Sequence, residues 1–394
     1  MSLKTEWGEI LDNRLKTYSS GEPDPKKRTI LFGMQMVGTA NAIIPVIKQL
    51  GGEFNWVSFN EQQSQKTMEA AGFFAGDTNI KYDRAIEYYH PDLVVTGVSQ
   101  VGPNQERKFT RDAVRKNIPV LWVLDNPGGV AASHFQRLYA VGAAPQYFAV
   151  SDEWSKDFVL ERVPGSKREQ VFVTGQPAFD TAYELSQRKE VLRSQLRLKL
   201  GISEGEKAIL FAGQLAGTEA TLKTLLTVLP NGTVVLPRFH PTRDGNLARY
   251  TPALDTAGGV RWVNTMEKMG ASTEHVVKST EELVTAADVV TGMFSTVQMT
   301  GIYLRTPVAY LLFDPDGRAA CRQDCQIPPE DLPMVQLRAA AGVFGEGDLQ
   351  PVVKRLLYDD SYRVDMQRTQ EKYYPCDGKN SQRVADVIRG ILQH

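Results

Sequence analysis

The sequence predicts an α/β protein with two domains, each a doubly wound parallel sheet that carries helices on both faces. Three observations carry this prediction. Short apolar segments alternate with helical patterns almost from end to end, a polar connector at residues 180–201 separates two such series, and 394 residues are too many for one ordinary core. The predicted domains are 1–185 and 186–374, and a last helix is expected in 375–394.

The first series of elements occupies residues 29–174. Its predicted strands are short and apolar, and the polar segments between them have helical spacing. Strands this apolar, each followed by a single helix, are typical of a parallel sheet with both faces covered. The predicted strands are 29–32, 54–58, 93–96, 120–124, 147–150 and 171–174, and the helices lie near 40–50, 62–71, 84–89, 106–116 and 153–161.

The second series follows the connector, which is rich in Arg, Lys, Glu and Gln and is itself predicted to be helical. Both series are Rossmann-like, and two such domains joined by one connector are expected to leave a cleft between the carboxyl ends of their sheets. We therefore expect ligand contacts in the loops at those ends. The predicted strands of this series are 208–212, 233–236, 260–263, 275–277, 289–291 and 308–312.

Composition narrows the class of protein. No apolar run approaches the ~18 residues that a membrane span needs, so no transmembrane segment is expected. The first residues lack the features of a signal peptide, which favours a cytoplasmic protein. A formal net charge of −1 without a long basic block argues against general nucleic-acid binding. The three cysteines fit a reducing compartment better than a disulfide framework, and a homodimer is compatible with this composition.

The segment 288–313 is the most informative part of the chain. An apolar strand ends at Gly292, Ser295 and Thr296 open a helix that runs to about Tyr303, and a second apolar strand follows. In such a βαβ unit the helix start carries free backbone N–H groups and the positive end of the helix dipole. We predict that Ser295 and Thr296 bind an anion there, most often a phosphate.

Two glycine-containing loops follow the first strands of the two halves. Gly38 and Thr39 end the first loop, and Gly213, Gln214 and Thr218 belong to the second. Because glycine lets the backbone come close to a ligand, we predict a cleft contact for the first loop and a donor phosphate or ribose contact for the second. The alternative for the first loop is a plain strand-to-helix turn with Thr39 as N-cap. No Gly-x-Gly-x-x-Gly pattern is present, so a dinucleotide dehydrogenase is unsupported.

A basic loop follows the predicted strand 233–236. Arg238, His240 and Arg243 lie within six residues, and arginine pairs bidentately with phosphate while an imidazole donates a proton to a leaving-group oxygen. We predict that His240 is catalytic and that the two arginines bind the donor. The alternative is a turn fixed by Pro241. His275 is either a strand-end histidine with local bonds or a residue that frames a nucleobase, and it is included among the donor-binding candidates.

Asp125 is the predicted general base. It leaves a strand at the carboxyl edge, in a Pro-Gly-Gly loop that keeps the backbone open to a ligand. A carboxylate in a cleft can take the proton of an acceptor hydroxyl as the new bond forms. The alternative is a turn in which the Asp125 side chain accepts backbone hydrogen bonds. Ser99 and Gln100, after the strand 93–96, are further acceptor-side candidates.

Four short segments of the chain resemble segments of known families. Residues His240-Pro241 after a strand are similar to the His-Pro of CDP-glycerol glycerophosphotransferases, and the segment 287–296, ADVVTGMFST, resembles their Ala-Asp-x-x-x-Thr-Asp-Tyr-Ser-Ser segment. The segment 377–383, DGKNSQR, resembles the element that opens the last helix both in these enzymes and in UDP-N-acetylglucosamine 2-epimerases. The segment 173–180 resembles their Thr-Gly-Asn-Pro segment. The chain thus resembles the GT-B superfamily, in particular the group that contains these two families.

This resemblance implies a GT-B fold whose last helix crosses back onto the first domain. It implies a nucleotide-diphosphate sugar as donor, UDP most of all, with no required cofactor or metal, and the sequence has no Asp-x-Asp pair placed to bind a metal. The epimerases carry two glutamates after the glutamine of the phosphate helix. Here Gln298, a donor-binding candidate, is followed by Met299 and Thr300, which disfavours epimerisation.

The predicted function is that of a glycosyltransferase, which moves a sugar or a similar group from a nucleotide-diphosphate donor to a hydroxyl of a small molecule or glycan. Such a transfer needs a stabilised leaving group, an aligned acceptor and one base. The helix start at 295–296 and the basic loop supply the first requirement, and Asp125 supplies the last. Two alternatives stay open, an epimerase-like isomerase and a non-catalytic nucleotide-sugar-binding protein.

Overall fold

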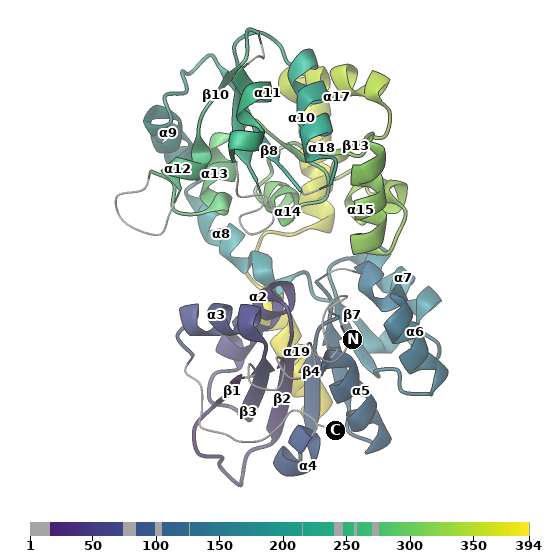
Figure 1. Ribbon diagram of the computed structural model, residues 1–394. Coiled ribbons are helices and arrows are strands. Elements are labelled where there is room, and N and C mark those ends of the chain that lie inside the picture. The colour runs from purple at the N-terminus through teal and green to yellow at the C-terminus, as the bar shows by residue number, and fades with distance from the viewer. Residues whose placement is uncertain are drawn as a thin grey trace, which may run out of the picture. The chain divides into compact units, whose positions relative to one another are not determined.

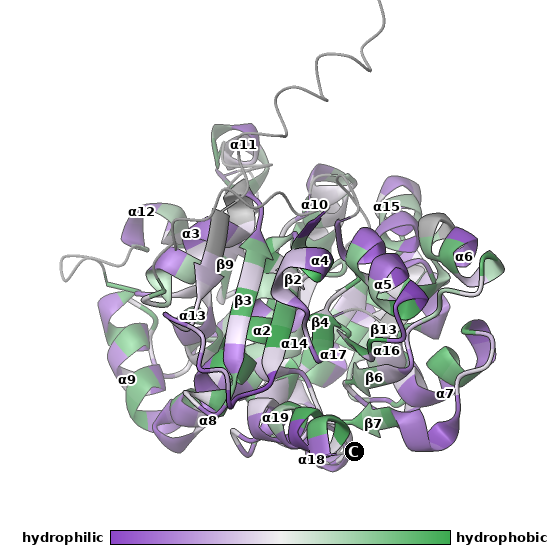
Figure 2. Ribbon diagram, turned by 90° about the horizontal axis from the view of Figure 1, so that it is seen from below, coloured by the Kyte–Doolittle hydropathy of each residue, from purple (hydrophilic) through white to green (hydrophobic). Residues whose placement is uncertain are grey.

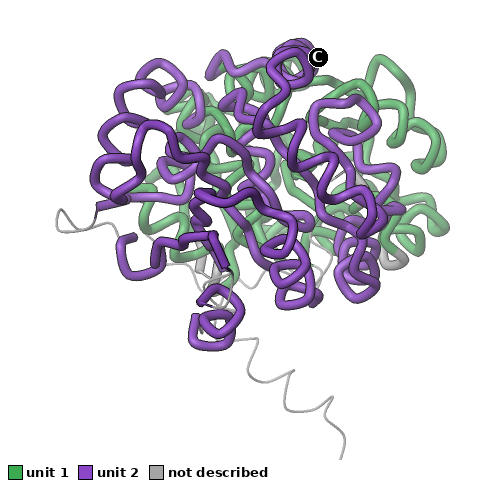
Figure 3. Tube along the Cα trace, turned by 90° about the horizontal axis from the view of Figure 1, so that it is seen from above, with its two compact units in different colours: residues 1–180, 379–394 green, residues 181–378 purple. Residues whose placement is uncertain are grey.

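The computed structural model describes residues 16–73, 84–98, 105–125, 127–214, 216–239, 247–255, 258–269 and 276–393. The chain divides into two compact units (Figures 1 and 3). Unit 1 contains residues up to Asp180 together with Lys379–His394, and unit 2 is Thr181–Gly378. The last helix, α19 (Asn380–Gln393), therefore belongs to the unit that contains the N-terminal half.

Unit 1 is built on a seven-stranded sheet with the order β1-β3-β2-β4-β5-β6-β7. All neighbouring strands are parallel except β1, which pairs antiparallel with β3. The strands are β1 (Lys16–Ser19), β2 (Thr29–Met34), β3 (Asn55–Asn60), β4 (Leu93–Thr96), β5 (Val120–Val123), β6 (Tyr147–Val150) and β7 (Val171–Val173). The helices are α2 (Val37–Leu50), α3 (Gln62–Ala70), α4 (Ala85–Tyr89), α5 (Gln105–Arg115), α6 (Ser133–Ala140), α7 (Glu153–Arg162) and α19.

The two faces of the unit 1 sheet are covered by different helices. On one face, Ile30 and Phe32 of β2 share a core with Ile43 of α2 and Ile388 of α19. On the other face, the ring of Phe109 on α5 packs against Phe59 of β3, with ring centroids 5.6 Å apart. Strand β4 is apolar up to Thr96 and is drawn mostly green in Figure 2, whereas β3 also contains polar residues. Burial on both faces explains why strands such as β4 are nearly continuous apolar runs.

Unit 2 contains a six-stranded, fully parallel sheet with the order β10-β9-β8-β11-β12-β13. Two helices of the connector, α8 (Asp180–Gln187) and α9 (Lys189–Lys199), lead into it. Its strands are β8 (Lys207–Ala212), β9 (Thr233–Arg238), β10 (Arg261–Trp262), β11 (Val289–Gly292), β12 (Val308–Leu311) and β13 (Ala341–Val343). Its helices are α10 (Thr218–Val228), α11 (Thr251–Asp255), α12 (Thr265–Lys268), α13 (Thr280–Ala286), α14 (Thr296–Tyr303), α15 (Pro315–Cys325), α16 (Pro333–Gln336), α17 (Glu346–Tyr358) and α18 (Asp360–Tyr373).

Helices cover both faces of this sheet as well. Leu222 of α10 and Leu349 of α17 share a core with Ile209 and the other inward residues of one face. Helix α14 lies on the opposite face, where Gly301 allows close approach: a Cβ at this position would stand 2.8 Å from a methyl group of Val308. The predicted fold class, two doubly wound parallel sheets, is therefore confirmed.

The structure differs from the predicted elements at four places, and one of these is helix α6, which was not predicted. Strands β1 and β13 are additional, and both are edge strands of three or four residues. In the predicted strand 275–277, His275 lies outside the described residues, and Val277 forms only an isolated bridge with Met269. A single bridge gives too little pairing for a strand, because each ladder bond must offset the cost of ordering the backbone.

Candidate functional site

The start of α14 lies at the carboxyl edge of the unit 2 sheet, directly after β11. Ser295 is its N-cap: the Ser295 Oγ accepts a hydrogen bond from the amide of Val297 at 3.3 Å, and the Ser295 amide donates to Oε1 of Gln298 at 2.8 Å. This capping box fixes the first turn because the polar groups of the helix end satisfy one another. Thr296 is exposed at the first helical position, where a backbone N–H has no partner within the helix.

Gln298 holds this helix start against the sheet. Its side chain is fully buried, and its Nε2 donates to the carbonyl of Gly292 at 3.2 Å and to the carbonyl of Ala309 at 2.9 Å. One side chain thus joins the end of β11, the first turn of α14 and strand β12. Because both ends of its amide bond to protein backbone, Gln298 acts on a ligand through the position of Ser295 and Thr296.

The Gly213 loop lies beside this helix start, after the neighbouring strand β8. No side chain fits at Gly213, because a Cβ there would stand 2.6 Å from the ring of Phe239 and 2.9 Å from the methyl group of Thr218. Gly217 has a φ of 73° and lies against the Asp314 carboxylate, which caps helix α15. The Thr218 Oγ is buried and has no hydrogen-bond partner among the described residues. The loop is therefore closely packed and leaves one buried hydroxyl unsatisfied.

Arg238 ends β9 at the same edge. Its Nε donates to the Thr280 Oγ at 3.0 Å, and its NH1 group donates to the carbonyl of Phe239 at 3.0 Å. Burial lowers the pKa of the guanidinium, with a smaller opposing effect of the Glu281 charge. Within the described residues, no carboxylate forms an ion pair with Arg238. A half-buried cation without a paired anion favours an anionic ligand nearby.

The strand order brings these groups to one place in unit 2. Strand β8 separates β9 from β11, so the ends of β9 and β11 lie about 10 Å apart. The carboxyl edge of this sheet therefore combines a guanidinium, a glycine loop and a helix start within the span of a diphosphate group and its attached sugar. We call this set of groups, where an anion is predicted to bind, the unit 2 anion site.

Unit 1 brings a second set of predicted residues together, at the carboxyl ends of β2, β4 and β5. The Asp125 carboxylate fills the space beside Gly38, where a Cβ would clash with it. The Thr39 side chain lies over Gly97, at 2.5 Å from the position that a Cβ would take. Thr39 is buried, whereas Asp125 is half-buried. A carboxylate on one loop thus contacts the glycine loop that starts α2, across the end of the intervening strand β4.

The Asp125 backbone is tied to the last helix through Gln176. The Gln176 Nε2 donates to the Asp125 carbonyl at 3.1 Å, and the Gln176 carbonyl accepts from Asn380 Nδ2 at 3.2 Å. The Asp180 carboxylate accepts the backbone amides of Asn380 and Ser381 at 2.9 and 2.8 Å, so it caps the start of α19. The segments 173–180 and 377–383, which carry the family resemblance, are therefore in direct contact within unit 1.

Glu61 is a further residue at the carboxyl edge of the unit 1 sheet, and sequence reasoning did not single it out. It directly follows β3 and is half-buried, and within the described part of the chain one of its carboxylate oxygens is buried without a hydrogen-bond partner. Burial raises the pKa of Glu61 to about 7. A carboxyl group that titrates near neutral pH is suited to accept a proton from a substrate. Its signal in the sequence is its place, the first charged residue after an apolar strand.

Several predicted residues lie outside the described residues, namely His240, Arg243, His275, Ser99 and Gln100. In the sequence Ser99 and Gln100 follow β4, His240 and Arg243 follow β9, and His275 comes before the bridge residue Val277. In the described part of the chain no group of three His, Cys, Asp or Glu side chains is arranged to hold a metal ion. None of the helices there is both long and apolar enough for a membrane span.

Solved structures share the whole two-unit architecture. UDP-GlcNAc 2-epimerase from Neisseria meningitidis, bound to UDP-GlcNAc, matches with a TM-score of 0.61 and 15% identity over 93% of this chain and 100% of its own. The S. aureus MnaA–UDP structure matches with a TM-score of 0.62 and 13% identity over 93% of this chain and 97% of its own. A variant of the wall teichoic acid polymerase TagF, with CDPG, matches with a TM-score of 0.52 and 14% identity over 94% of this chain and 90% of its own. These likenesses confirm the GT-B fold. A search of curated proteins by sequence found no match.

The model of one family, described as CDP-Glycerol:Poly(glycerophosphate) glycerophosphotransferase, matches residues 124–390 of the chain. The match covers more than half of the 394 residues, so the chain belongs to this family. The protein is a transferase that moves a group from a nucleotide-linked donor to an acceptor, as the sequence predicts.

Proposed function

We propose that the protein transfers glycerol phosphate from CDP-glycerol to a hydroxyl group of its acceptor. The family match carries this proposal, because it extends from Leu124 at the end of β5 through the unit 2 anion site to α19. The sequence alone favours a UDP-linked sugar. The family description favours a cytidine donor and a glycerophosphate group instead, and this is the donor that we propose.

The transferred group fixes which bond breaks. When a glycerol phosphate group leaves CDP-glycerol, the bond between the two phosphates breaks, CMP departs, and the acceptor oxygen bonds to the phosphorus that carries glycerol. In a sugar transfer the bond from the sugar carbon to oxygen breaks instead, and a nucleoside diphosphate departs. The catalytic requirement in the first case is stabilisation of the phosphoryl oxygens, which helix starts and cationic groups provide.

In this proposal the unit 2 anion site binds the diphosphate of the donor. Thr296 presents its backbone N–H at the capped helix start, and Arg238 supplies a guanidinium at the same sheet edge. The unpartnered Thr218 hydroxyl and the backbone of Gly213 and Gln214 line the neighbouring loop. His240, Arg243 and His275 stay predicted donor contacts, with His240 as the group that gives a proton to the departing CMP oxygen.

The acceptor hydroxyl is proposed to bind at the carboxyl edge of unit 1. Asp125, beside Gly38 and Thr39, takes the proton of the acceptor hydroxyl as its oxygen bonds to phosphorus. Ser99 and Gln100 stay predicted acceptor contacts. This division assigns the donor to unit 2 and the acceptor to unit 1, as in the predicted domains 186–374 and 1–185. A cytoplasmic location and a homodimer stay predictions, and light scattering of the purified protein checks the second.

Analysis of the released nucleotide tests this proposal. The protein is incubated with CDP-glycerol, and separately with UDP-N-acetylglucosamine, in the presence of polyol and glycerol phosphate acceptors, and the nucleotides are separated by chromatography. We expect CMP from CDP-glycerol, and a loss of at least 100-fold in its rate of release in Asp125→Asn. Release of UDP from the sugar donor alone would replace the proposed reaction with glycosyl transfer.

A second candidate function, epimerisation, can be tested with the same protein and the same sugar nucleotide. The structures of epimerases share the fold, yet the helix of this chain has Met299 and Thr300 after Gln298, in place of two glutamates. Incubation with UDP-N-acetylglucosamine in heavy water without acceptor is expected to leave the sugar free of deuterium. Deuterium at C2 of the sugar would favour an isomerase. Binding of CDP-glycerol without turnover under every condition would favour a binding protein.

A further inference from the structure

A second polar pocket of unit 2 lies at the opposite edge of its sheet. It has a volume of about 200 Å³ and is lined at the amino ends of three strands, by Lys207 at the start of β8, Asp288 before β11 and Pro307 before β12. Helices α9 and α18 contribute further lining residues. Because all strands of this sheet are parallel, the pocket is separated from the unit 2 anion site by the length of β8, six residues or about 20 Å.

Positive charge dominates the lining of this pocket. Five cationic side chains face two carboxylates, Asp288 and Glu190, and all five cations are half-buried. The cations are Lys189, Arg193, Lys207, Arg305 and Arg363. Cations held in a half-buried pocket repel one another more strongly than in water, so their balance with nearby carboxylates decides whether an anion is required.

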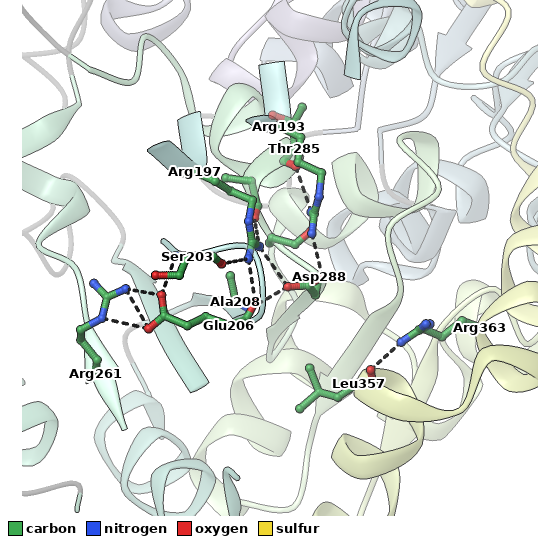
Figure 4. A network of polar contacts seen from close by, with 12 residues as sticks. Arg193, Arg197, Ser203, Glu206, Ala208, Arg261, Thr285, Asp288, Leu357 and Arg363 are labelled. Atoms are coloured by element: carbon green, nitrogen blue, oxygen red, sulfur yellow. Dashed lines mark hydrogen bonds and ion pairs between the residues drawn. The ribbon is translucent and has the colours of Figure 1, made fainter. Parts of the chain in front are cut away.

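Asp288 neutralises only one of the five cations, Arg193, because its carboxylate is shared with Arg197 and with a backbone amide. Its two oxygens accept from Arg193 at 2.7 Å and from Arg197 at 3.2 Å, and the backbone amide of Ala208 donates to it at 2.8 Å. Figure 4 shows both guanidiniums directed at this one carboxylate. Glu190 is exposed. Each carboxylate therefore leaves the inner cations of the pocket unpaired.

Lys189 and Arg305 are those inner cations. The Lys189 ammonium donates to the carbonyl of Leu304 at 2.7 Å and to the Thr306 Oγ at 3.3 Å, while Arg305 donates to the carbonyls of Ile302 and Tyr374. Neither forms an ion pair with a carboxylate of the described residues. The pKa of Lys189 is lowered to about 8, chiefly by burial; the charges of Arg193 and Arg305 act in the same direction, and those of Glu190 and Asp288 oppose them.

Helix α14 explains the orientation of these two cations but not their number. Both donate to carbonyls at the carboxyl end of α14, which attracts positive charge. One cation satisfies such a helix end, whereas here Lys207 adds to the same pocket, with the centroid of the Tyr358 ring 5.9 Å from its ammonium. Arg363 also lines the pocket, but its charge is paired with the Asp360 carboxylate. The surplus positive charge is thus larger than helix capping needs.

We propose that this pocket binds a phosphate group. The surplus of half-buried cations, among them guanidiniums that pair with phosphate oxygens, fits a tetrahedral oxyanion. The volume of about 200 Å³ lies below the roughly 300–1,000 Å³ of pockets that hold drug-sized ligands, so the pocket takes the phosphate group and not a whole nucleotide. The group belongs either to inorganic phosphate or to an ester of phosphate with glycerol. This site is separate from the donor site and does not depend on the proposed reaction.

Thermal stability at constant ionic strength tests this proposal. Inorganic phosphate is titrated into the full-length protein against a chloride reference, because a ligand that binds only the folded state raises the Tm in a saturable way. We expect saturation in the wild type and an increase of at least fivefold in the half-saturating concentration in Lys207→Gln and in Lys189→Met. Lys189→Arg keeps the charge and is expected to retain binding. Glycerol phosphate and a glycerol phosphodiester form two further arms, which identify the form of phosphate preferred.

Two controls separate this pocket from the donor site. Arg238→Met removes a cation of the unit 2 anion site, and it is expected to leave the half-saturating phosphate concentration of the amino-edge pocket within twofold of wild type. Lys223→Gln removes a surface charge from α10 and serves as the matched control for Lys207→Gln. Lys189→Met removes a donor from the carbonyl of Leu304 and lowers stability by itself. Lys207→Gln breaks no hydrogen bond of the described residues. It therefore keeps the test valid if Lys189→Met unfolds.

Proton uptake gives an independent readout. Sulfate has the shape of phosphate but does not titrate near neutral pH, so calorimetry of sulfate binding at pH 8.5 in two buffers with different ionisation enthalpies measures protons taken up by the protein. An anion beside Lys189 raises its pKa, and we expect uptake in the wild type but not in Lys189→Met. Equal phosphate half-saturation in wild type, Lys207→Gln and Lys189→Met, or a Tm that rises without saturation, would overturn the proposal.

Discussion

Replacement of Gln298 by leucine is the sharpest test of how the start of α14 is positioned. Leucine has a similar volume, but it removes three hydrogen bonds, with the amide of Ser295 at 2.8 Å and the carbonyls of Gly292 and Ala309 at 3.2 and 2.9 Å. Each such bond contributes about 0.5–1.5 kcal/mol net, so the free energy of unfolding is expected to fall by about 2–4 kcal/mol.

Urea unfolding, followed by tryptophan fluorescence, measures this loss. The matched control is Gln195→Leu on the exposed face of α9, where we expect a change within about 0.5 kcal/mol. CDP binding is measured on the folded Gln298→Leu protein, and its Kd is expected to rise at least tenfold because the first turn of α14 loses its attachment to β11 and β12. A change in unfolding free energy equal to that of Gln195→Leu would refute this account of the helix start.

Three further predictions concern unit 1. Burial raises the pKa of Glu61 from 4.5 to about 7, so the folded state binds this proton more tightly and stability falls as pH rises from 4.5 to 7. Urea titrations at pH 5 and pH 8 measure this loss of unfolding free energy, which is up to about 3 kcal/mol in the wild type and is expected to disappear in Glu61→Gln. An equal pH dependence of the unfolding free energy in the two proteins would contradict the raised pKa. Asp180→Asn keeps only one acceptor for the amides of Asn380 and Ser381, so a loss of about 1–2 kcal/mol and faster hydrogen exchange in α19 are expected, with unaltered exchange as the opposing result. Gly175 has a φ of 75° and no space for a Cβ beside Asn380, so Gly175→Ala is expected to lower the Tm, whereas a raised Tm would show that the backbone relaxes freely.

Most of the parallel strands could be predicted from the sequence, because strands that are buried on both faces consist of nearly continuous apolar residues. The helix predicted to open at Ser295 and Thr296 begins at Thr296 and ends at Tyr303, since strand end, cap and helix are all encoded locally. The connector 180–201 is helical for the same reason, as α8 and α9. Local signals were therefore sufficient for most of both sheets.

The two edge strands could not be predicted from such signals. Strand β1 has one large apolar residue, Tyr18, and exists because it pairs antiparallel with β3, some forty residues later. Strand β13 consists of Ala341, Gly342 and Val343, whose small side chains give no strand pattern. Both depend on a partner strand that lies elsewhere in the sequence, and propensity has little weight against tertiary pairing.

The groupings at the candidate site depend on strand order, which the sequence does not encode in any short segment. Gly38 and Asp125 meet because β4 alone separates β2 from β5, and Arg238 lies near the start of α14 because β8 alone separates β9 from β11. Glu61 was missed for a different reason. Its raised pKa comes from burial, which is a property of the folded surroundings and not of the residue type.

A crystal structure of the protein with CDP tests the central claim most directly. The account predicts that the diphosphate lies at the start of α14, with a phosphate oxygen within hydrogen-bond distance, about 2.7–3.2 Å, of the Thr296 amide and with the Arg238 guanidinium beside it. Density for the nucleotide at any other place, with the first turn of α14 free of phosphate, would contradict it.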